Sequence, residues 1–177
     1  RKITAAIEEK RMDYNDLPSN IKWVENIRIS GDFRYRHESF DVDDIPDRDR
    51  NRIRARLGIK AKLSNEWDAI FRLASGSSDS PTSTNQSFDD SFSQDEFWLD
   101  RAYVDWHPDK MPGLNVYLGK MKNPFYRVGG SQLIWDSDLS IEGIGVKHEM
   151  QLTEATDLYI NGGGFWVKED SGDDDIS

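Results

Sequence analysis

The feature that most constrains this chain is a two-residue period of apolar and charged side chains. From Ile27 to Arg36 the odd positions hold apolar or aromatic residues and one glycine, while the even positions are polar or charged. Residues 52–63 repeat the pattern, with isoleucine, leucine and alanine alternating with arginine and lysine. Successive side chains of a strand point to opposite faces, whereas a helix would scatter these charges around its circumference. The period therefore predicts β-strands with one apolar and one basic face.

Five further segments show the same period less strictly. They cover residues 67–74, 101–106, about 113–121, about 142–152 and about 156–168. Short and long connections alternate between the seven candidate strands: residues 64–66, 108–112 and 153–155 are short, and 38–50, 76–96 and 122–141 are long. In an antiparallel meander, alternate connections lie at opposite ends of the sheet. We therefore expect all the long loops at one end, as in an outer-membrane barrel.

The amino-terminal segment has a different pattern. Residues 3–15 have the spacing of a short amphipathic helix, and turn residues follow it. We expect residues 1–20 to form a periplasmic helix and linker, and residues 21–177 to form the amino-terminal part of a barrel.

Composition supports a membrane barrel over a soluble fold. Only 36% of the 177 residues are hydrophobic, which is low for a domain that must bury a full core and is consistent with a water-filled interior. Mean hydropathy of −0.76 does not exclude membrane strands, because barrel strands alternate apolar and polar residues. A soluble antiparallel sandwich has the same period, but its polar face meets bulk water and carries mixed charges. The concentrated arginine here favours a confined aqueous lumen.

Charge and motif content narrow the function classes. A net charge of −10 argues against nucleic-acid binding, which needs a basic surface. The chain has no cysteine, its three histidines are far apart, and no serine lies in a nucleophile elbow. The sequence therefore predicts neither an enzyme nor a cofactor or metal site.

Several stretches in order along the chain resemble the putative porin family of Gram-negative outer membranes. They are Ile29-Ser30-Gly31-Asp32-Phe33-Arg34-Tyr35-Arg36, Asp49 through Gly58, Leu73-Ala74-Ser75-Gly76 with Ser83 through Gln86, Trp98 through Trp106, Gly119 through Phe125, and Trp135-Asp136-Ser137-Asp138 with Glu142-Gly143. The resemblance implies a single-chain barrel in the outer membrane, in contact with lipid and lipopolysaccharide. Closed single-chain bacterial barrels have an even number of strands, so seven strands indicate a larger barrel. Whether it forms a homo-oligomer stays open.

We expect a passive diffusion channel for small hydrophilic solutes, with the basic face lining the pore and favouring anions. The predicted pore-lining residues are Arg28, Asp32, Arg34, Arg36, Arg52, Arg54, Arg56, Lys60, Lys62, Asp68, Arg72, Arg101 and Asp105. The predicted lipid-facing residues are Ile27, Ile29, Phe33, Ile53, Leu57, Ile59, Trp67 and Phe71.

Three alternatives stay open. In the first, the acids Asp32, Asp68, Asp100 and Asp105 pair with the arginines, which then stabilise the barrel wall and do not select ions. In the second, the barrel is a scaffold or sheath for a secretion or electron-transfer partner. In the third, the chain is a soluble β-sandwich that binds carbohydrate through exposed tryptophan and aspartate.

Overall fold

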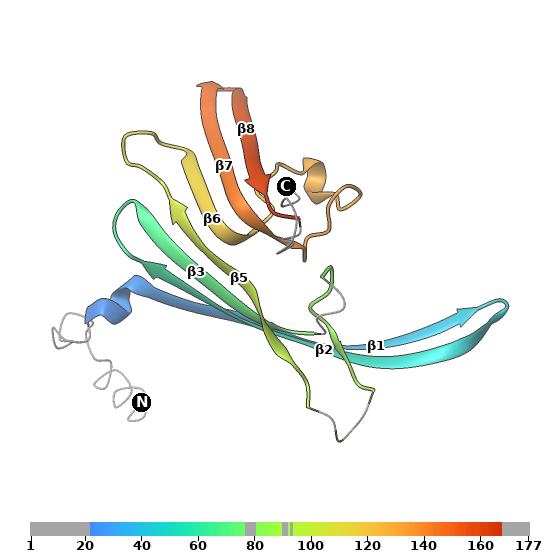
Figure 1. Ribbon diagram of the computed structural model, residues 1–177. Coiled ribbons are helices and arrows are strands. Elements are labelled where there is room, and N and C mark those ends of the chain that lie inside the picture. Colours follow the sequence, from blue (N-terminus) through green and yellow to red (C-terminus); the bar gives the residue numbers. More distant parts are fainter. Residues whose placement is uncertain (1–21, 77–80, 90–91, 93, 168–177) are drawn as a thin grey trace, which may run out of the picture.

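The computed structural model describes residues 22–76, 81–89, 92 and 94–167. In these residues the chain forms an antiparallel sheet that curves into a half-barrel (Figure 1). The predicted helix at residues 3–15 lies outside the described residues. The described part begins with a 3-10 helix, η2 (Lys22–Asn26), and contains a second, η3 (Val128–Gly130). No described helix is long and apolar enough to cross a membrane.

Seven long strands follow one another as a meander. The strands are β1 (Ile27–Val42), β2 (Ile45–Lys62), β3 (Trp67–Ser75), β5 (Phe97–Trp106), β6 (Leu114–Lys122), β7 (Ser140–Thr153) and β8 (Thr156–Phe165). A two-residue strand, β4 (Gln86–Ser87), lies between β3 and β5 in the sequence and pairs with β2. The sheet order β1-β2-β3-β5-β6-β7-β8 confirms the predicted sequential antiparallel pairing.

The short connections lie together at one end of the sheet, which we call the short-turn end. Residues 63–66, 107–113 and 154–155 form them, and Ile27 lies beside Ala61 at this end, directly after η2. The β1–β2 turn, residues 81–89 and residues 123–139 lie at the opposite end. The predicted placement of the two sets of connections at opposite ends of the sheet is confirmed.

The first connection differs from the prediction. The sequence predicts a long connection at residues 38–50, but β1 and β2 continue through these residues to a turn at Asp43-Asp44. Cross-strand pairs explain the extension, because Glu38 lies opposite Arg50 and Phe40 opposite Arg48. Opposite charges across a strand pair stabilise a hairpin, and the Arg50 guanidinium also lies 5.2 Å from the centre of the Phe40 ring. Asp44 has φ 66°, a conformation that aspartate tolerates in tight turns.

The cross-strand register places the two sets of predicted residues on opposite faces. Arg34 lies opposite Arg54 and Arg36 opposite Arg52, whereas Ile29 lies opposite Ile59. We call the face with the arginines the inner face, because Ser83, Asn85 and Asp138 from two loops contact the arginines on it. The other is the outer face, on which Phe33 is 72% and Ile29 68% exposed.

Neither face has the apolar core of a soluble sandwich. Among the described residues, the buried apolar side chains are Ala69, Ala74, Met121, Pro108 and Pro124, while many larger ones are exposed on the outer face. No second layer of sheet covers the first in the described part of the chain. Large contiguous apolar surface of this kind needs an apolar environment around it. The fold is therefore that of a partial membrane barrel.

Candidate functional site

All the predicted pore-lining residues lie on the inner face. The register aligns Asp32 with Arg56, Gly58 with Arg72 and Lys62 with Asp68, and continues to β5. There Arg72 lies opposite Arg101 and Asp68 opposite Asp105. We call six of the inner-face residues of β1 and β2 the arginine wall: Arg34, Arg36, Arg50, Arg52, Arg54 and Arg56.

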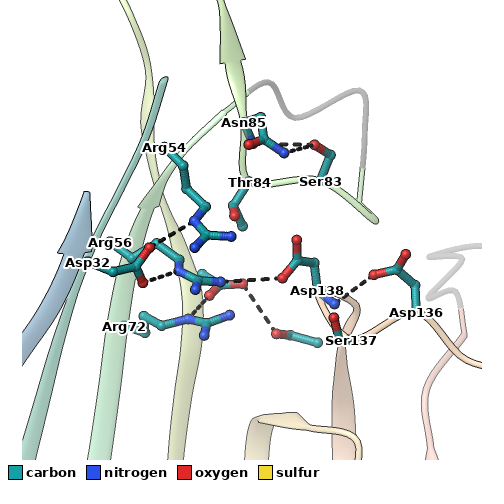
Figure 2. Close-up of polar contacts among 12 residues, drawn as sticks. Asp32, Arg54, Arg56, Arg72, Ser83, Thr84, Asn85, Asp136, Ser137 and Asp138 are labelled. Atoms are coloured by element: carbon teal, nitrogen blue, oxygen red, sulfur yellow. Dashed lines mark hydrogen bonds and ion pairs between the residues drawn. The ribbon is translucent and has the colours of Figure 1, made fainter. Parts of the chain in front are cut away.

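Two acids of β1 bridge neighbouring arginines of this wall. Asp32 accepts hydrogen bonds from Nε of Arg54 at 2.8 Å and Nε of Arg56 at 2.7 Å (Figure 2). Glu38 is 2.5 Å from Nη2 of both Arg36 and Arg50. Each carboxylate thus joins two guanidinium groups, which fixes their positions on the wall.

A third acid reaches the wall from the β6–β7 loop. Asp138 lies 3.3 Å from Nη1 of Arg56, and its own backbone N–H is held by the Asp136 carboxylate at 2.7 Å (Figure 2). In the sequence, Asp136 and Asp138 indicate either a carboxylate pair at the pore mouth or capping of the loop by aspartate, and the Asp136 contact is such a cap. The contact between Asp138 and Arg56 joins residues 82 positions apart, so no local pattern predicts it.

The same loop covers the inner face of β5 to β8. Residues 123–127 and Gly130, together with Tyr103, Asp105, Tyr117 and Lys147, line a cavity of about 430 Å³. Tyr126 stacks on Tyr159 of β8 at 5.1 Å, and Phe125 contacts Phe165 edge to face at 5.9 Å. Aromatic pairs of this kind add to the stability of the contact. The loop therefore lies inside the half-barrel and narrows its interior.

Asp100 is an inner-face residue that strict alternation misplaces. The register shifts between Arg72 and Leu73, so that Asp100 and Arg101 form a bulge in β5. Asp100 is completely buried, forms an ion pair with Arg72 and accepts a hydrogen bond from Ser140 at 3.3 Å. If residues of β5 alternated strictly between the two faces, Asp100 would lie on the apolar face, next to Arg101 on the inner face. An acidic residue on an apolar face is a sequence signal that a bulge interrupts the alternation.

The loop after β3 supplies neutral partners to two arginines. Asn85 Oδ1 accepts from Nη2 of Arg34 at 2.5 Å, and the Asn85 main-chain carbonyl accepts from Nη2 of Arg52 at 3.2 Å. Ser83 Oγ lies 3.4 Å from the same Arg52 nitrogen. Among the described residues, no carboxylate forms an ion pair with either arginine within 4.0 Å, so both guanidinium groups bind only neutral groups.

Toward the short-turn end the acids have other partners. Asp68 lies 2.7 Å from Nζ of Lys60 and 3.1 Å from Nε2 of His107. Asp105 accepts from Nδ2 of Asn115 at 2.9 Å. Of the four acids proposed to neutralise the arginines, Asp32 and Asp100 therefore pair with arginine, and Asp68 and Asp105 do not.

The far end of the hairpin contains a carboxylate with a shifted pKa. Membrane strands need about 9–11 residues, so Glu38, eleven residues after Ile27, lies beyond the span. Partial burial of its carboxyl acts to raise the pKa, but the hydrogen bond from Arg50 and the charges of Arg36 and Arg50 outweigh it. The pKa of Glu38 is therefore lower than its usual value.

The described residues contain no cluster of three or more histidine, aspartate or glutamate side chains that could hold a metal ion. Comparison with known proteins gives one finding on the family. The family model described as putative porin matches residues 40–175, which is most of the chain. No curated protein matches the chain.

Proposed function

Because this chain belongs to the putative porin family of outer-membrane channels, we propose that its pore is lined by the inner face and prefers anions. The charge balance of the arginine wall carries this proposal. Six guanidinium groups face three carboxylates, Asp32, Glu38 and Asp138, in the described structure. The surplus positive charge lies in a space that the β6–β7 loop narrows.

The physical reason is focusing of the field by the barrel. Charges in a narrow aqueous space with low-dielectric walls raise the local concentration of counter-ions. At physiological salt the Debye length is about 8 Å, comparable with the radius of a small pore. The excess arginine charge therefore acts on ions along the whole cross-section.

The orientation follows from the lengths of the connections. Outer-membrane barrels have short periplasmic turns and long outer loops. This pattern supports a periplasmic short-turn end with the amino terminus beside it, and an extracellular β1–β2 hairpin. Solvated acids such as Asp41, Asp43 and Asp47 then lie at the level of lipopolysaccharide, where divalent cations would bridge like charges.

The reversal potential under a salt gradient tests anion preference. In the full-length protein in a planar lipid bilayer, Arg34→Gln, Arg52→Gln and Arg54→Gln together should move the reversal potential toward cation preference. The shift should shrink as salt approaches 1 M, where the Debye length falls to about 3 Å. A reversal potential that stays unchanged at low salt would show that the arginines stabilise the barrel wall and do not influence ion selectivity.

A further inference from the structure

Two arginines of the wall differ from their neighbours in their partners. Asp32 bridges Arg54 and Arg56, and Glu38 bridges Arg36 and Arg50. Arg34 and Arg52 remain, and they are diagonal neighbours, since Arg34 lies opposite Arg54 and Arg52 opposite Arg36. Both guanidinium groups reach the same residue, Asn85. The wall thus contains a third arginine pair whose bridging carboxylate is replaced by neutral groups.

The segment that carries these neutral groups is firmly held. The Ser75 hydroxyl donates to the carbonyl of the fully buried Thr84 and accepts the backbone N–H of Ala55. Gln86 and Ser87 pair with β2, and the backbone N–H of Phe88 donates to the carbonyl of Asn51.

The start of the loop fits this close packing. Gly76 has φ 130°, and a Cβ there would lie 3.3 Å from the backbone of Ser83 and Thr84. A side chain at Gly76 would therefore be strained. Ser83 and Asn85 are positioned by the backbone before any solute arrives.

Two hydrogen-bond donors have no partner at this place in the described structure. Nε of Arg34 and Nε of Arg52 are buried and form no hydrogen bond to the described residues. Ser83 Oγ accepts from Arg52, from the backbone N–H of Asn85 and from Asn85 Nδ2. Its own hydroxyl proton has no acceptor among the contacts of the described residues. A guanidinium group carries five N–H donors in a planar fork that matches the two oxygens of a carboxylate.

We propose that Arg34, Arg52 and Ser83 form a binding site for the carboxylate group of organic anions that pass through the pore. The solute supplies the bridge that Asp32 and Glu38 supply to the other two pairs. This inference rests on the proposed function, because it names the class of anion that the pore selects. Chloride lacks the planar pair of oxygens and gains only from the general positive potential.

Competition between gluconate and chloride tests the site in the full-length protein in a planar bilayer. Gluconate should reduce the chloride current along a saturable curve. Arg34→Gln and Arg52→Gln should each raise the half-blocking concentration at least tenfold. Asn85→Asp, which places a carboxylate beside Arg34 with almost no change in shape, should abolish saturable block.

Asn161→Asp is the matched control. Asn161 is an inner-face amide of β8, opposite Lys147, so this variant adds the same charge to a different part of the wall. We expect its half-blocking concentration to stay within about threefold of wild type.

Two results would contradict the site and leave anion preference intact. One is an equal weakening of gluconate block by Asn161→Asp and Asn85→Asp, and the other is a non-saturable effect of gluconate on the wild-type protein. A wild-type reversal potential without anion preference overturns the proposed function itself. Heat-modifiable migration on gels shows that each variant is folded.

Discussion

At the scale of single residues, the inner and outer faces tolerate charge very differently. Leu57 lies on the outer face, opposite Gly31 and Leu73, and is 44% exposed in the half-barrel. Leu57→Arg near the middle of the bilayer should cost about 2–4 kcal/mol and lower the yield of folded barrel. Ile70, on the inner face opposite Lys60, provides the control. Urea titration of folding into vesicles should show a much smaller cost for Ile70→Arg, and equal costs would contradict the assignment of the faces.

Asp100 shows how much a buried charge depends on its partner. Asp100 is completely buried against Arg72, so Asp100→Asn leaves Arg72 without a counter-charge. Breaking a buried ion pair costs about 3–5 kcal/mol, and Arg72 is partly accessible to water, so we expect a loss of about 3 kcal/mol in urea unfolding. The double variant Asp100→Asn with Arg72→Met should recover part of that loss. A double variant as unstable as the sum of the two single variants would show that the pair is not coupled.

At the scale of elements, the β1–β2 hairpin extends beyond the membrane span because of its cross-strand charges. Glu38 has a lowered pKa, so its contribution to stability is complete above its usual value of 4.5 and is lost as pH falls through the folded value. A spin label at Phe40→Cys should therefore become more mobile between pH 6 and pH 3. In the Glu38→Gln background the mobility should be high at both pH values. A pH response that persists in Glu38→Gln would show that another group holds the hairpin.

Long strands with a strict period could be predicted from the sequence, whereas departures from the period could not. β1 to β3 follow the pattern because every second residue faces the apolar side. The extension of the hairpin through residues 38–50 escaped prediction because its charges pair across strands, which a sequence read along one strand does not reveal. The bulge at Asp100 escaped because one extra residue reverses the two faces.

At the scale of the whole molecule, the site combines residues that the chain brings together over long distances. The arginines could be predicted as one face because they belong to two neighbouring strands. Their partners Asn85 and Asp138 come from loops that fold against the inner face, 51 residues from Arg34 and 82 from Arg56. Loop positions depend on the curvature of the sheet and on contacts such as the Tyr126–Tyr159 stack, which no local pattern encodes.

The central claim is that one sheet separates lipid from a water-filled lumen, and alternation of chemical accessibility along β2 tests it most directly. The chain has no cysteine, so each cysteine introduced singly from Arg52 to Ala61 in the full-length protein is unique. A charged, membrane-impermeant thiol reagent should react at Arg52, Arg54, Arg56, Gly58 and Lys60 and change the single-channel conductance. At Ile53, Ala55, Leu57, Ile59 and Ala61 it should neither react nor alter the conductance. Equal reactivity at odd and even positions would contradict the account.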